Sequence, residues 1–162
     1  MTAGPRGMYF EDFEPGMQFE TQSRTITQTD IVNFACLTGD FNAVHTDWEY
    51  CKNTPFGEPI AHGMLVAGVA AGLLYASGMN DGTLVALLEV KSWKMLAPVK
   101  HGDTIRNVTT VKETRPTSKG DRGVVRFLRQ IRNQHGETVQ EMDVAVMYRC
   151  RKSAGTGGNA NG

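Results

Sequence analysis

The apolar positions of this chain follow two different periods. Up to about residue 82 they recur at helical spacing, and beyond it they alternate with polar positions. Residues 27–39 and 61–77 predict two helices, the first capped by Thr27 and ended by Gly39. Four later segments rich in Val, Ile, Thr and aromatic residues predict strands over residues 84–95, 103–114, 122–133 and 138–149.

The second predicted helix is apolar on every side, which indicates burial on every side. One such helix followed by a run of antiparallel strands is the α+β pattern. In the last strand, a period-two apolar face contains Met142, Val144, Val146 and Tyr148. We therefore expect a single sheet that wraps around the long helix.

The remaining segments divide the chain into three parts. Residues 1–16 predict an entry segment whose aromatic side chains dock on the domain, residues 17–152 the domain itself, and residues 153–162 a disordered Gly/Asn-rich tail. Within the domain, residues 17–26 are compatible with a strand. Residues 40–46 predict a loop, and Trp48–Cys51 a short helical turn.

Length and composition exclude several classes of protein. With 162 residues, of which 40% are hydrophobic and 21% charged, the chain fits one globular domain and is neither disordered nor collagen-like. Three widely spaced cysteines without a CxxC pair predict no disulfide framework and no zinc site. The longest apolar run, Met64–Met79, is too short for a membrane span, and the N-terminus lacks a secretory h-region. We expect a cytoplasmic protein that does not bind a membrane.

The charges cancel overall but not locally. Lys and Arg total 17 and Asp and Glu total 17, yet residues 1–81 carry a net −7 and residues 82–162 a net +7. We favour pairing of the two halves within one fold. Alternatively, bases such as Lys100 and Arg126 meet the phosphates of a ligand. The arginines on the predicted strands lack an RNA-binding motif, so no nucleic-acid partner is expected.

Two short stretches carry candidate chemistry. In Thr38–His45, a loop can point Asp40 and His45 at one spot, and Asn42 can fix the loop. An Asp near a His can exchange protons with a bound water. In Pro59–Leu65, Gly63 begins the apolar helix, where an unsatisfied backbone N–H can stabilise a developing oxyanion. Each stretch alone also fits an ordinary turn or helix start, with His62 as a capping or packing residue.

Taken together, the sequence Gly39-Asp40-Phe41-Asn42 with His45, followed by Ile60-Ala61-His62-Gly63-Met64-Leu65, resembles the MaoC-like dehydratase family, which includes the (R)-specific enoyl-CoA hydratases. The resemblance covers roughly residues 10–150. Ala43 departs from it, since the family usually has proline there, and this bears on the stiffness of the loop.

The resemblance implies a single hot-dog domain that forms a homodimer and acts on acyl-CoA thioesters. It implies that Asp40 and His45 form the catalytic acid–base pair, that the Gly63 amide polarises the thioester carbonyl, and that Asn42 holds the loop. Asn42, His62 and Met64 are the expected substrate-binding residues. No metal or organic cofactor is expected.

The expected reaction is the reversible addition of water across the trans-2 double bond of an acyl thioester. Which of Asp40 and His45 is the base stays open at this point. A thioesterase on the same fold is one alternative. A non-catalytic acyl-CoA-binding partner subunit is the other, although the intact Asp40, His45 and Gly63 argue against it.

Overall fold

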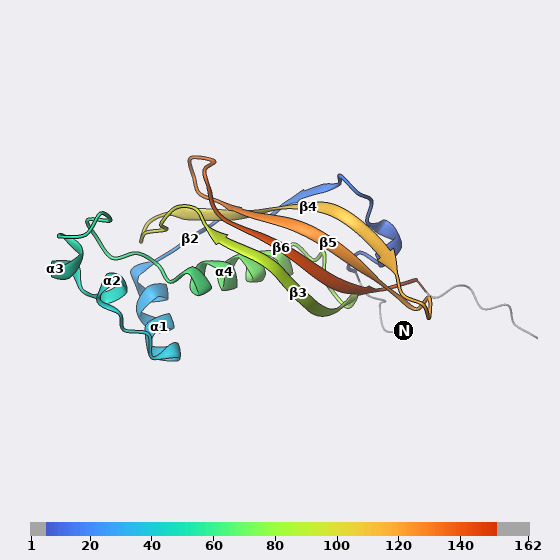
Figure 1. The fold of residues 1–162 in the computed structure, drawn as a ribbon, viewed down its shortest axis with the longest axis horizontal. Coiled ribbons are helices and arrows are strands. Elements are labelled where there is room, and N and C mark those ends of the chain that lie inside the picture. Colours follow the sequence, from blue (N-terminus) through green and yellow to red (C-terminus); the bar gives the residue numbers. More distant parts are fainter. Residues whose placement is uncertain (1–5, 152–162) are drawn as a thin grey trace, which may run out of the picture.

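The computed structural model describes residues 6–151. A six-stranded antiparallel sheet arches over one long helix, α4 (Figure 1). This arrangement confirms the expected α+β class with a single sheet. The predicted tail at 153–162 and residues 1–5 of the entry segment lie outside the described residues.

The sheet has the strand order β1-β4-β5-β6-β3, with β2 pairing with β4 near the β1 edge. The long strands are β3 (Leu84–Met95), β4 (Thr104–Pro116), β5 (Arg122–Arg132) and β6 (Thr138–Arg149). All four lie within two residues of the predicted bounds, because alternating apolar residues between tight turns define a strand locally.

The strand expected over residues 17–26 is divided in two. β1 (Gln18–Glu20) and β2 (Arg24–Thr25) both pair with β4, and the chain leaves the ladder between them. At the break, the buried Thr21 accepts a hydrogen bond from the Asn107 backbone N–H through its side-chain hydroxyl. A hydroxyl group thus takes the place of a ladder carbonyl, which lets the backbone turn.

Helix α4 (Gly63–Ala76) packs one face against the sheet through Leu65, Val66, Ala70 and Leu74. Its opposite face is open: Met64 and Tyr75 are 62% and 72% exposed. The expectation of burial on every side is therefore wrong for a single chain, because the sheet covers only one side of the helix. The neighbouring edge strand β3 also exposes apolar side chains, namely Leu84, Val85, Leu87, Leu88 and Val90.

Three short helices lie beyond one end of the sheet, near the N-terminal end of α4 (Figure 1). α1 (Gln28–Thr38) begins with a reciprocal capping box between Thr27 and Asp30 and ends at Gly39, which has φ 77°. The segment expected to be a loop contains one helical turn, α2 (Ala43–Thr46), followed by α3 (Trp48–Cys51). No helix within residues 6–151 is long and apolar enough to cross a membrane.

Candidate active site

Asp40 lies in the turn that joins α1 to α2. Its Oδ1 accepts hydrogen bonds from the Asn42 side-chain amide at 2.6 Å and from the Asn42 backbone N–H at 3.3 Å. These donors, the backbone N–H above all, together with the nearby His45 and His62 rings, lower the pKa of Asp40 below its ordinary value. Asp40 is therefore an ionised acceptor at neutral pH, and Oδ2 is the oxygen that Asn42 leaves free.

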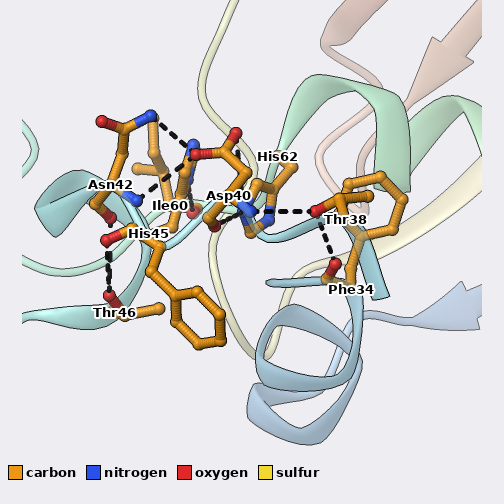
Figure 2. Close-up of polar contacts among 9 residues, drawn as sticks. Phe34, Thr38, Asp40, Asn42, His45, Thr46, Ile60 and His62 are labelled. Atoms are coloured by element: carbon orange, nitrogen blue, oxygen red, sulfur yellow. Dashed lines mark hydrogen bonds and ion pairs between the residues drawn. The ribbon is translucent and has the colours of Figure 1, made fainter. Parts of the chain in front are cut away.

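His45 comes from α2, the helical turn that follows Asn42. Its Nδ1 lies 2.7 Å from the carbonyl oxygen of Ile60 (Figure 2). Because a carbonyl oxygen only accepts, we assign the imidazole proton to Nδ1. In the neutral ring, Nε2 then carries a free lone pair. Asp40 and His45 thus offer two acceptors that one water molecule can satisfy.

His62 is buried behind this pair. Its Nε2 donates to the backbone oxygen of Asp40 at 2.9 Å, and its ring stacks on that of His45 with 3.7 Å between centroids (Figure 2). Phe34 packs against the His62 ring at 5.0 Å. His62 therefore orders both Asp40 and His45 from the protein side of the site.

Asp40, His45 and His62 are also the one group of candidate metal ligands found in the described part of the chain, with ligand atoms within 4.8 Å of one another. Both imidazole N–H groups point at carbonyls, and the second nitrogen of His62, Nδ1, is buried without a partner. Only Asp40 and the Nε2 of His45 remain available. Two ligands fall short of the three protein ligands typical of a catalytic zinc site.

Gly63 is the first residue of α4. Its N–H donates to no backbone or side-chain group within residues 6–151, as is usual for the first turn of a helix. A Cβ at this position would lie 2.8 Å from the Met95 methyl group. The missing side chain therefore lets Met95 pack closely against the first turn of the helix.

His45 and Gly63 both line a pocket of about 330 Å³. Its wall is mostly apolar and comes from the 53–60 segment, α4, the last residue of β3 and the segment that follows β3: Phe56, Ile60, Val66, Met95, Leu96 and Pro98. One polar side chain, Gln140 of β6, also faces the pocket. An apolar pocket with a few convergent polar groups is suited to an acyl chain with a reactive end.

The structure brings some of the predicted site residues together and places others away from the pocket. It brings Asp40, His45 and His62 together, and His45 and Gly63 line the same pocket. Asn42 contacts Asp40, as expected for a loop-holding residue. None of the three expected substrate-binding residues, Asn42, His62 and Met64, lines the pocket. His62 is buried behind the pair, and Met64 is exposed on the open side of α4. Their contact with substrate stays a prediction.

The two basic residues considered as phosphate contacts, Lys100 and Arg126, have different surroundings. Arg126 is neutralised by three carboxylates, those of Glu89, Glu113 and Asp143, in agreement with pairing between strands. Lys100 lies near the pocket, where its Nζ donates to the Phe56 carbonyl and pairs with Glu58. Sequence reasoning missed Gln140, although a glutamine that continues an apolar strand face was a visible signal.

Comparison with known proteins agrees with this geometry. Residues 12–130 match the family model described as MaoC like domain. The chain belongs to this family. It is 38% identical over 111 residues to the (R)-specific enoyl-CoA hydratase of Rhodospirillum rubrum, covering 68% of this chain and 74% of that protein. It is 39% identical over 108 residues to Protein MaoC of Klebsiella aerogenes, which is 67% of this chain but only 32% of that protein.

The fold is that of the hot-dog proteins. A Mycobacterium tuberculosis protein described as having a double hotdogfold superposes with a TM-score of 0.79 at 21% identity. The alignment covers 93% of this chain and 47% of that one. This likeness bears on the fold alone, and it confirms the hot-dog architecture expected from the sequence.

Proposed function

We propose that the protein is an (R)-specific enoyl-CoA hydratase that also runs in the reverse direction as a 3-hydroxyacyl-CoA dehydratase. The observation that carries this proposal is the meeting of two features at one pocket. His45 of the acceptor pair lines this pocket together with Gly63, and Asp40 lies close to His45. The Gly63 N–H has no hydrogen-bond partner within residues 6–151. The names of the related hydratases support the same assignment.

The acceptor pair accounts for activation of the water. A water molecule can donate one O–H to Oδ2 of the Asp40 carboxylate and the other to Nε2 of the neutral His45 ring, because both atoms are acceptors. As the water oxygen bonds to C3 of the enoyl thioester, the pair removes one of its protons. The pair then returns one proton to C2, so that the net change is addition of H and OH across the double bond.

The Gly63 amide accounts for stabilisation of the negative charge. While the C3–O bond forms, electrons move from the double bond onto the thioester oxygen, and an enolate-like oxyanion develops. A backbone N–H at the positive end of α4 donates a hydrogen bond to that oxygen. Because Gly63 has no side chain, the thioester can approach this N–H closely.

Incubation with crotonyl-CoA tests the proposal. Hydration predicts loss of the absorbance of the conjugated double bond without release of free thiol. Asp40→Asn and His45→Gln should each fold and lose most of this activity, since the two groups act on one water and removal of either disables the pair. Release of CoA would instead identify a thioesterase. Stabilisation by acyl-CoA without turnover would identify a binding subunit.

We also propose that the active form is a homodimer joined through β3. This strand is an open sheet edge twelve residues long with exposed apolar side chains, and such edges are usually paired or covered. Pairing with β3 of a second copy would extend the sheet and cover apolar surface next to α4. Sedimentation of the intact protein at micromolar concentration measures this state directly.

A further inference from the structure

Gln140 interrupts an otherwise apolar strand face. In β6 the side chains of Met142, Val144, Val146 and Tyr148 form the face turned toward α4, and Gln140 continues the same alternation. Gln140 is 3% exposed. Burying an amide costs free energy unless its hydrogen bonds are made, so an amide on this face needs specific partners.

Two hydrogen bonds of Gln140 connect the sheet to the helix. Trp93 of β3 donates its Nε1–H to Oε1 of Gln140 at 3.1 Å, and Nε2 of Gln140 donates to the carbonyl oxygen of Gly63 at 2.9 Å. The indole N–H can only donate and the Gly63 carbonyl can only accept. These two partners therefore fix which end of the amide faces each of them.

The second of these hydrogen bonds is made to Gly63, the residue whose N–H is the proposed oxyanion donor. Gly63 stands in the first turn of α4, where the backbone is free to fray and has no side chain to anchor it. Met95, which pairs with Gln140 across β3 and β6, lies against the same glycine. The only side-chain hydrogen bond to the Gly63 backbone among the described residues comes from Gln140.

We infer that Gln140 is a positioning residue, which braces the first turn of α4 through the Gly63 carbonyl and so holds the Gly63 N–H in the direction that catalysis requires. This inference rests on the proposed hydratase function. Small displacements of an oxyanion donor matter because its hydrogen bond must reach the oxygen as charge develops, and loss of one such donor costs about 10²–10³ in rate.

Three variants test the brace. Gln140→Leu removes both hydrogen bonds and leaves an apolar side chain in an apolar wall, so the protein should fold. We expect kcat for crotonyl-CoA to fall by about tenfold or more, with KM within about threefold, because the brace acts on a transition-state contact. Gln130→Leu is the matched control. It makes the same change on β5, where the amide donates to Glu141, and should leave kcat unchanged.

Gln140→Glu adds a pH readout that a merely structural role would not give. When protonated, the new carboxyl can donate to the Gly63 carbonyl and restore the brace. When ionised, it repels that oxygen. Its rate relative to the wild type should therefore be near one at low pH and fall as pH rises through the pKa of the new carboxyl, which burial raises.

A measurement independent of turnover separates this inference from the proposed function. Exchange of the Gly63 amide proton, followed by NMR in the resting protein, should be faster in Gln140→Leu than in the wild type and unchanged in Gln130→Leu. If the wild type hydrates no enoyl-CoA, the proposed function fails. The exchange rate of the Gly63 amide then still shows whether Gln140 holds the first turn of α4 in place. Unchanged exchange, or a Gln140→Leu enzyme with wild-type kcat, overturns the inference.

Discussion

Adding one methyl group at Gly63 is the sharpest test of where the thioester binds. The backbone there has no positive φ, so Gly63→Ala is compatible with the helix. The new Cβ would lie 2.8 Å from Cε and 3.1 Å from Sδ of Met95, closer than side chains pack. Met95 is 54% exposed and flexible, so its tip can move aside. The methyl group then occupies the space through which a carbonyl would reach the Gly63 N–H.

Two opposite effects follow from this geometry. In an exposed helix interior, Ala is more favourable than Gly by about 1 kcal/mol, and at the first turn the gain is smaller, so the free energy of unfolding should stay constant or rise slightly. Activity should fall because the N–H remains but the oxyanion no longer reaches it. Loss of one such contact costs about 3–4 kcal/mol, which corresponds to about 10²–10³ in kcat/KM.

Crotonyl-CoA hydration and thermal unfolding, measured on the same preparations, separate these effects. Gly72→Ala is the control, because it adds a methyl group to the same helix at a position where, beyond the local helix backbone, no heavy atom would lie within 4 Å. We expect wild-type activity from the control and a deep loss from Gly63→Ala at unchanged Tm. If Gly63→Ala keeps its activity within about threefold, the Gly63 amide is not the oxyanion donor.

Three further changes address other parts of the structure. Asn42→Ala removes a side-chain donor to Asp40 and so raises the pKa of that carboxyl; because the ionised form is the working form, the acidic limb of kcat/KM should move to higher pH, and an unmoved limb would contradict the role of Asn42. Leu87→Lys places a charge on the exposed β3 edge and should convert a dimer into monomers in sedimentation; a wild-type monomer would refute edge pairing. Arg129→Met removes a guanidinium whose buried Nε has no hydrogen-bond partner and whose pKa is lowered by burial, so Tm should rise by a few degrees; a lower Tm would show that the charge is stabilised in the folded protein.

The parts of the fold that sequence could predict are those with local causes. The Thr27–Asp30 capping box and Gly39 define α1, and alternation defines each long strand to within two residues. No local sequence signal determines which face of α4 the sheet covers. A helix that is apolar all around predicts burial, but which side the sheet covers depends on strand pairing across the whole chain. The open side of α4 is consistent with coverage by a second copy of the chain. The position of such a copy cannot be read from the sequence of one chain.

The candidate site divides in the same way. Asp40 and His45 are five residues apart, so a short turn was enough to suggest that they meet. The support given by His62 spans 22 residues and passes through the backbone oxygen of Asp40, an atom that every residue type carries. A side-chain pattern therefore cannot report this contact, and His62 was expected to touch substrate rather than to order the pair.

Gln140 shows why a visible signal can still be ambiguous. Its row of the sheet continues through Ile131 to Asn107, which is a second buried polar side chain on a mostly apolar face. Both residues break the alternation in the same manner, but their partners differ. The Asn107 side chain accepts a hydrogen bond from Thr109, and the Asn107 backbone N–H donates to Thr21 at the β1–β2 break. Because a buried amide can serve either a backbone irregularity or a helix terminus, only its partners distinguish the two uses. For Gln140 the partner is the carbonyl of Gly63. The hydrogen bond that offsets the burial of this amide is therefore made to the residue whose N–H the proposed reaction needs.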